Sequence, residues 1–185
     1  KLCGAKVLSS ATTVEEAQWL EANGADIIIA QGLEAGGHRG MFLTEDVTTQ
    51  VGTLGLVSQI LDAVNLPVVA AGGIADAAGV AAVLRLGAIA AQVGTSYLLC
   101  PEVTTSALHR AAIQGPRARH TALTNLLTGR PARSIVNRIM QELGPISSAP
   151  SAFPLAAASL SLLRAEAEGE GRDDFTPLWC GQNAK

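Results

Sequence analysis

The chain has 185 residues, is 48% hydrophobic and 16% charged, and carries a formal net charge of −3. This is the composition of an ordinary globular domain, and its thirteen Lys and Arg residues provide no basic surface for nucleic acid or a membrane. The apolar runs are shorter than the roughly 18 residues of a membrane-spanning helix, and no signal-peptide pattern is present, which predicts a cytoplasmic protein. The three cysteines form no Cys-x-x-Cys pair, which predicts reduced thiols and no metal site.

Predicted strands and helices alternate over the first 113 residues. Thr12 and Glu15 have the spacing of a capping box, and Asp76 is expected to cap a later helix. In chain order we expect a strand at 6–10, a helix at 12–22, a strand at 26–30, a helix at 54–64, a strand at 68–71, a helix at 76–86, a strand at 88–93 and a helix from 104 or 105 to 112. Such repeated β-α units are typical of an open doubly wound sheet or a closed (β/α)8 barrel.

The pattern changes from Gln114 onward. Helices are expected at 120–127, 134–143 and 156–167, and the sequence at 169–174 predicts a surface turn. We therefore divide the chain into βα units at 1–113 and a helical segment at 114–185 that packs on them.

The segment AQGLEAGGHRG at 30–40 follows an apolar strand whose unbroken run predicts burial on both faces. Its glycines let the backbone approach a ligand closely, and His38 then presents an imidazole. A loop histidine in this position is a candidate general base or anion-binding group; alternatively, it makes only a local hydrogen bond. Glu34 is expected to pair with Arg39 or to orient the site, without a catalytic role.

Two glycine turns, Gly72-Gly73 and Gly94-Thr95, follow successive predicted strands and precede helices, and Ser96 adds a hydroxyl donor. In (β/α)8 barrels such turns bind phosphate through backbone N–H groups, although glycines also serve simply to make tight turns. Gln31 and Gln92 end two strands, where a side-chain amide can bind the edge of a heteroaromatic ring or remain a satisfied polar group. No P-loop, nucleophile elbow or His-Glu-x-x-His helix is present.

Four segments, at 30–40, 70–76, 92–95 and 128–133, together resemble the FMN-dependent nitronate monooxygenases, formerly called 2-nitropropane dioxygenases, of the bacterial class I type. The resemblance covers nearly the whole chain, including the closing segment at 177–183. It implies an α/β fold that is the C-terminal half of a TIM-like (β/α)8 barrel, about four βα units, followed by a helical C-terminal segment. Because family members have about twice as many strands, the chain is expected to be a fragment.

The resemblance also implies a cofactor and a site. His38 corresponds to the active-site histidine of the family, and the βα units at 1–113 are expected to bind FMN. No metal is implied. The residues implied as cofactor contacts are Gln31, Gly36, Gly72, Gly73, Gln92, Val93, Gly94 and Thr95.

The implied reaction is FMN-dependent oxidation of an alkyl nitronate, such as propionate 3-nitronate, with O2 to a carbonyl compound and nitrite or nitrate. The isolated fragment is expected to be weakly active or inactive, and its partner to be the missing N-terminal half or a second copy. Alternative functions are an FMN-dependent NAD(P)H:quinone or enoyl reductase, a flavin-free phosphate-sugar barrel enzyme, and a non-catalytic half-barrel that acts as an interaction module.

Overall fold

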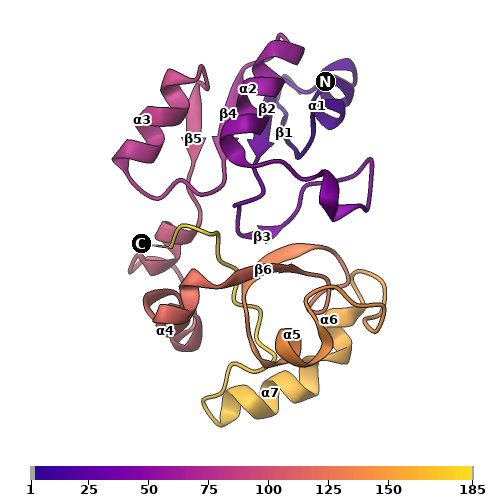
Figure 1. The fold of residues 1–185 in the computed structure, drawn as a ribbon, viewed down its shortest axis with the longest axis vertical. Helices are drawn as coiled ribbons and strands as arrows, with labels where there is room; N and C mark the ends of the chain where they lie inside the picture. Colours follow the sequence, from indigo (N-terminus) through magenta and orange to yellow (C-terminus); the bar gives the residue numbers. More distant parts are fainter. Residues whose placement is uncertain (1–2, 185) are drawn as a thin grey trace. The chain divides into compact units, whose positions relative to one another are not determined.

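Residues 3–184 are described by a computed structural model, whose ribbon is shown in Figure 1. The chain forms two units. Unit 1 holds the residues up to Ala35 together with Gly40–Val93, and unit 2 holds Gly36–Arg39 together with the residues from Gly94 onward. Unit 1 is built on a parallel sheet, whereas unit 2 combines an antiparallel sheet with helices.

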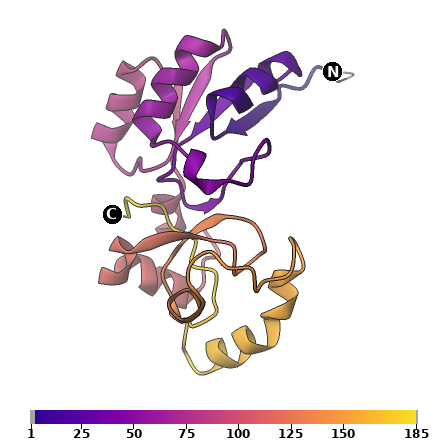
Figure 2. The same cartoon turned by 45° about the vertical axis from the view of Figure 1, so that its right-hand side comes forward.

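Unit 1 has four parallel strands in the order β1-β2-β4-β5. Its elements are β1 (Leu8–Ala11), α1 (Val14–Ala22), β2 (Ile27–Gln31), the 3₁₀ helix η1 (Val47–Thr49), α2 (Thr53–Ala63), β4 (Val68–Ala71), α3 (Ala77–Arg85) and β5 (Ala90–Gln92). Figures 1 and 2 show the helices α1, α2 and α3 alongside these strands. The predicted succession of βα units is confirmed in this unit.

The core of unit 1 lies between its helices and one face of the sheet. Ile28 of β2 and Val68 of β4 are fully buried there, together with Leu56 and Ile60 of α2. Because successive side chains of a strand point to opposite faces, the neighbours of Ile28 lie on the other face, where they are only half-buried. The prediction that this strand is covered on both faces is therefore wrong.

The helix caps of unit 1 follow from local sequence, with one shift of position. Asp76 caps α3 as predicted, because its Oδ1 accepts a backbone N–H of the first turn at 2.9 Å. The N-cap of α1 is Thr13 rather than Thr12, since Thr13 Oγ1 accepts the N–H of Glu16 at 3.3 Å. The Glu16 carboxylate, and not that of Glu15, reaches back to the N–H of Thr12 at 2.7 Å. The cap therefore lies one residue after the predicted Thr12, and the returning bond of Glu16 goes to the residue before the N-cap and not to the N-cap itself.

Unit 2 contains a three-stranded antiparallel sheet in the order β3-β7-β6. Its elements are β3 (Gly37–His38), η2 (Thr95–Leu99), α4 (Ala107–Gln114), η3 (Pro116–Arg119), β6 (Thr121–Thr124), β7 (Ala132–Ile135), α5 (Arg138–Leu143), α6 (Ala156–Ser159) and α7 (Ser161–Gly169). The elements labelled η are 3₁₀ helices.

The prediction of an all-helical C-terminal segment is wrong in two places. The helix predicted at 120–127 is instead the strand β6, and the helix predicted at 134–143 is the end of β7 followed by α5. Residues 121–124 pair with residues 132–135 in an antiparallel ladder, and this pairing outweighs their helical spacing. The last predicted helix, at 156–167, is divided into α6 and α7.

Helix α4 starts later than expected and belongs to unit 2. Its cap is Ser106, not Thr104 or Thr105, because Ser106 Oγ accepts a backbone N–H of the first turn at 3.3 Å. Ile113, near its end, packs in one core with Ile135 of β7. The expected division after residue 113 therefore does not coincide with the boundary between the units.

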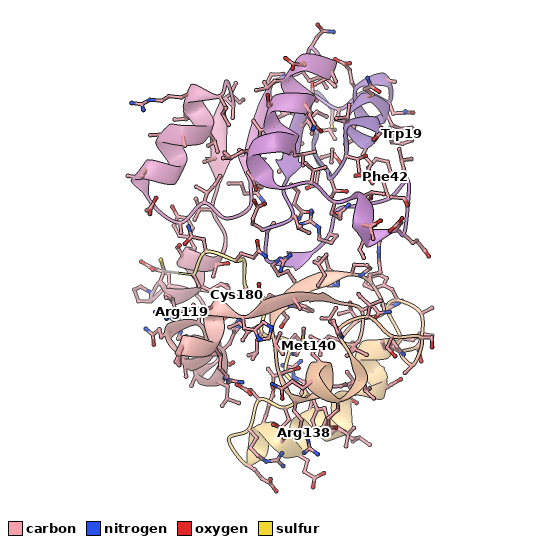
Figure 3. All side chains as sticks on the ribbon, in the orientation of Figure 1. Trp19, Phe42, Arg119, Arg138, Met140 and Cys180 are labelled. Atoms are coloured by element: carbon pink, nitrogen blue, oxygen red, sulfur yellow. The ribbon has the colours of Figure 1, made fainter. Side chains whose placement is uncertain are left out.

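The segment before the C-terminus runs beside β7. Trp179 forms a bridge with Ser134, and the N–H of Ile135 donates to the carbonyl oxygen of Leu178 at 2.9 Å. Cys180, labelled in Figure 3, is fully buried in the same core as Ile135. Since β6 occupies one edge of β7 along its whole length, Trp179 and β3 share the other edge.

No helix in residues 3–184 is long and apolar enough to cross a membrane. Within the same range, no three His, Cys, Asp or Glu side chains are grouped so that they could hold a metal ion. Cys3, Cys100 and Cys180 are free thiols.

Candidate active site

The carboxyl ends of the parallel strands in unit 1 carry polar side chains. The strand register pairs Gln31 of β2 with Ala71 of β4, and Ala71 with Gln92 of β5, so the two glutamines lie in one row at the same end of the sheet. Gln31 Oε1 accepts the N–H of Gly40 at 2.7 Å, whereas Gln92 is exposed. In parallel α/β folds this end of the sheet is where ligands bind.

Glu34 and Thr53 join the turn after β2 to the start of α2. The Glu34 carboxylate accepts the N–H of Thr53 at 2.8 Å and its hydroxyl at 2.7 Å. Thr53 Oγ1 also lies 2.9 Å from the carbonyl oxygen of Gly72, in the turn after β4. A carboxylate at the first N–H groups of a helix is favoured by the helix dipole. Glu34 therefore holds two turns of unit 1 together.

Gly72 and Gly73 form a turn that only glycine can make. Both have positive φ, +118° and +67°. A Cβ at Gly72 would lie 2.8 Å from Thr53 Oγ1 and 3.0 Å from the nitrogen of Ala35. The turn thus presents backbone groups, and no side chains, beyond the end of β4.

In unit 2, the start of η2 combines an open backbone with a buried hydroxyl. A Cβ at Gly94 would meet nothing within 4 Å. Thr95 Oγ1 accepts the N–H of Gly181 at 2.9 Å. The Ser96 hydroxyl is buried and has no hydrogen-bond partner among residues 3–184. Because buried polar groups are normally paired, Ser96 marks this turn as a candidate ligand site.

His38 lies on the strand β3, not in the loop that its glycine-rich surroundings predicted. It pairs with Ala132 of β7, and the N–H of Arg39 donates to the carbonyl oxygen of Pro131 at 2.9 Å. The ring is also bound, since Nε2 lies 2.9 Å from Thr128 Oγ1. One segment of unit 2, residues 128–132, therefore holds both the backbone and the imidazole.

Two aromatic rings and a cation lie near His38 within unit 2. The ring centroid of Trp179 is 5.3 Å from that of His38, and the centroid of Phe153 is 5.9 Å away in an edge-on arrangement. The Arg130 guanidinium lies 5.8 Å from the centre of the Phe153 ring. Partial burial, and secondly the charge of Arg130, lower the pKa of His38. Both effects favour the neutral form of the imidazole.

His109 supports Trp179 from helix α4. Its Nε2 lies 3.0 Å from the carbonyl oxygen of Trp179 and carries the hydrogen, because a carbonyl only accepts. Partial burial lowers the pKa of His109, and this hydrogen bond opposes the shift. The contact fixes the backbone of the residue whose indole faces His38.

The predicted site residues are distributed over both units. Unit 1 holds Gln31, Gly72, Gly73, Gln92 and Val93, and unit 2 holds Gly36, His38, Gly94 and Thr95. Val93 packs against the core of unit 1. A Cβ at Gly36 would lie 2.5 Å from the nitrogen of Gly181, so packing alone requires glycine there.

Sequence reasoning did not identify the neighbours of His38. These are Thr128, Arg130, Phe153 and Trp179. The segments at 128–133 and 177–183 carried a signal, because both belong to the family resemblance. Phe153 lies in a stretch rich in Ala, Ser and Pro that carried none.

Comparison with known sequences finds similarity to nitronate monooxygenases. The family model described as nitronate monooxygenase matches residues 1–185. A nitronate monooxygenase of Pseudomonas aeruginosa is 46% identical over 182 residues, and one of Paraburkholderia phytofirmans is 42% identical over 186 residues. The alignments cover 98% and 100% of this chain but 52% and 50% of the relatives. The chain thus spans about half the length of the curated relatives it matches.

Solved structures show the same relationship. The nitroalkane oxidase from Streptomyces ansochromogenes matches with a TM-score of 0.89 at 45% identity, over 98% of this chain and 52% of that chain. FabK from Thermotoga maritima matches with a TM-score of 0.72 at 30% identity, over 98% of this chain and 55% of that chain. The expected α/β fold, about half of a TIM-like barrel, is confirmed. On the match over its whole length, the chain belongs to the nitronate monooxygenase family.

Proposed function

We propose that this chain supplies the active-site histidine and flavin-binding residues of an FMN-dependent enzyme that oxidises alkyl nitronates with O2 to a carbonyl compound and nitrite or nitrate. The observation that carries the proposal is the setting of His38, a neutral imidazole beside two aromatic rings and the charge of Arg130. Membership of the nitronate monooxygenase family and likeness to a nitroalkane oxidase support the same chemistry.

FMN is the proposed cofactor, and two features of unit 2 fit it. Gly94 leaves open space beside its backbone, and the Ser96 hydroxyl is buried without a partner among residues 3–184. Backbone N–H groups and hydroxyls at such turns bind phosphate. We propose as FMN contacts Gln31, Gly36, Gly72, Gly73, Gln92, Val93, Gly94 and Thr95, with Ser96 added. When bound, FMN would supply the electron acceptor for the oxidation.

The work proposed for His38 depends on its protonation state. A neutral imidazole has one N–H and one lone pair, so it can donate a hydrogen bond to the oxygen of a nitronate or take the α-proton of a nitroalkane. Arg130 places a positive charge near the ring, which favours an anionic substrate. Trp179 and Phe153 offer apolar surface to an alkyl chain beside the ring.

The proposed oxidation is tested on the chain joined to a half that matches the rest of its relatives, by mixing this FMN-loaded protein anaerobically with propionate 3-nitronate and following the flavin absorbance. We expect the oxidised flavin to bleach, and nitrite or nitrate to form when O2 is admitted. Bleaching by NADH but not by the nitronate would replace the proposal with a reductase. A protein that binds no FMN would rule out both.

The proposed flavin contact of Ser96 has a separate test. Ser96→Ala removes the buried hydroxyl and is expected to raise the Kd for FMN about tenfold, the effect of losing one net hydrogen bond. Ser58→Ala, on the exposed side of α2, is the matched control and should leave the Kd unchanged. Equal affinities of both variants and the parent for FMN would remove Ser96 from the site.

We further propose that residues matching the other half of the relatives complete the parallel sheet of unit 1. β1 and β5 are its edge strands, and Leu8 and Ile89 at these edges are 51% and 57% exposed. Unpaired edges with apolar side chains favour further strands. We expect the 185-residue chain expressed alone to oxidise nitronate far more slowly than the chain joined to such a half. Equal rates would contradict this.

A further inference from the structure

We propose that Thr128 is a positioning residue for His38, whose hydroxyl holds the imidazole at Nε2 in the orientation in which the ring meets its substrate. The two side-chain atoms lie 2.9 Å apart, a hydrogen-bond distance. Thr128 is not among the proposed flavin contacts, and its hydroxyl bonds the ring of His38, so we expect its effect to pass through His38. The expected effect on turnover rests on the proposed function, but the hydrogen bond itself does not.

The turn that carries Thr128 is held independently of His38. Thr128 Oγ1 lies 3.4 Å from the backbone nitrogen of Arg130 and 3.3 Å from its carbonyl oxygen, a short side-chain-to-backbone turn. The N–H of Gly129 donates to the carbonyl oxygen of Asn125 at 2.8 Å. Gly129 has a φ of +90°, and a Cβ there would lie 2.5 Å from the nitrogen of Phe153. These contacts hold the turn that carries the Thr128 hydroxyl, and none of them involves His38.

The backbone pairing of β3 does not fix the orientation of the His38 ring, and the contact with Thr128 restricts it. Pairing of His38 with Ala132 sets the position of the Cα atom, but χ1 and χ2 can still turn. The ring contacts with Trp179 and Phe153 restrict the plane of the imidazole but not which of its nitrogens faces Thr128. The bond to Thr128 is a directional contact that favours one of these orientations.

The same bond affects the protonation of His38. An imidazolium donates a stronger hydrogen bond to a hydroxyl oxygen than a neutral ring does, so Thr128 favours the charged form. Partial burial and, secondly, the positive charge of Arg130 act in the opposite direction. A valine at position 128 keeps the shape of threonine but cannot accept, and is therefore expected to lower the pKa of His38 further.

The experiment is an NMR titration of histidine-labelled protein, in which the three histidines are resolved. Thr128→Val is compared with Thr128→Ser, which keeps the hydroxyl, and with Thr104→Val, an exposed threonine in the same unit. We expect Thr128→Val to lower the pKa of His38 and to weaken the cross-peaks between its ring and Trp179. Thr128→Ser and Thr104→Val should resemble the parent.

Kinetics provide the second readout. Thr128→Val should lower kcat/KM for nitronate about tenfold and move its acid limb in step with the His38 pKa, while Thr128→Ser restores both. If the pKa and ring contacts of His38 are the same in Thr128→Val as in the parent, the proposal is overturned. If no variant, nor the parent, oxidises nitronate, the proposed function fails while the titration still decides the role of Thr128.

Discussion

The carboxylate of Glu16 accepts the backbone N–H of Phe42 at 2.6 Å, although the two residues are 26 positions apart. Glu16 is fully buried and also accepts from the N–H of Thr12 at 2.7 Å and from that of Leu43 at 3.2 Å. Phe42 in turn packs edge-on against Trp19, one helical turn after Glu16, and Figure 3 shows this pair. Glu16 thus fastens helix α1 to the segment that follows His38 in the chain.

Replacing Glu16 should be costly for stability. Glu16→Ala leaves the buried N–H of Thr12 and the partly buried N–H groups of Phe42 and Leu43 without this acceptor, and we expect the free energy of unfolding to fall by about 3 kcal/mol. Urea denaturation measures this change. Glu15→Ala, the exposed neighbour in the same helical turn, should change the free energy by less than about 0.5 kcal/mol. Similar losses in both variants would show that Glu16 has no special anchoring role.

Glycine is required at position 72 but not in helix α2. Gly72→Ala introduces a Cβ 2.8 Å from Thr53 Oγ1 at a φ of +118°, and should lower the free energy of unfolding by about 2 kcal/mol. Gly55→Ala places its Cβ at ordinary contact distance, 3.4 Å from Val51, in an exposed helical position, and should stabilise by about 0.5 kcal/mol. Thermal or urea unfolding of both variants distinguishes them; destabilisation by both would contradict the argument.

His38 should be essential to turnover and dispensable for folding. Its side chain is exposed, so His38→Ala is expected to leave the circular dichroism spectrum unchanged while kcat/KM for nitronate falls about 10²–10⁴-fold. His120→Ala, another exposed histidine of unit 2, is the control and should retain the parent rate. A His38→Ala protein with the parent's kcat/KM would assign the chemistry elsewhere.

Activity should persist into mildly acidic solution. The proposed function uses the neutral form of His38, whose pKa is lowered from the ordinary histidine value of about 6.5 by partial burial and by the charge of Arg130. Lowering the pH through that pKa protonates the ring, so the midpoint of the acid limb of kcat/KM should lie below pH 6.5. Arg130→Gln removes the positive charge that opposes protonation, which raises the pKa and moves the acid limb to higher pH.

Arg130→Lys is the matched control for this pH dependence, because it keeps the positive charge. Its pH–rate profile for kcat/KM should follow the parent's. An acid limb that stays in place in Arg130→Gln would mean that the charge of Arg130 does not act on His38.

Cys180 should be inert toward thiol reagents in the folded protein. Burial raises the pKa of its thiol to about 11, so almost no thiolate is present at pH 8. Exposed Cys3 provides an internal comparison and should react promptly with a maleimide. Rapid labelling of Cys180 without denaturant, detected by peptide mass spectrometry, would contradict its burial.

Several features of the structure could be predicted because they depend on residues close together in sequence. The cap at Asp76 depends on a backbone N–H three residues later, and the alternation of strands and helices in unit 1 depends on apolar spacing within each segment. The choice of His38 likewise came from the glycines beside it. Each of these is a local property, because the interacting groups lie within one turn or one strand.

The predictions that were wrong or missing concern contacts between residues that are far apart in sequence. Residues 120–127 have helical spacing, yet pairing with β7 makes a strand of residues 121–124. The surroundings of His38 are assembled from Thr128, Phe153 and Trp179, the first of them 90 positions away. Sequence by itself determined the βα succession and the cap at Asp76, and it singled out His38 as a candidate. Only the tertiary structure decided what surrounds that histidine, because hydrogen bonds and ring contacts between distant segments exist only once those segments have packed together.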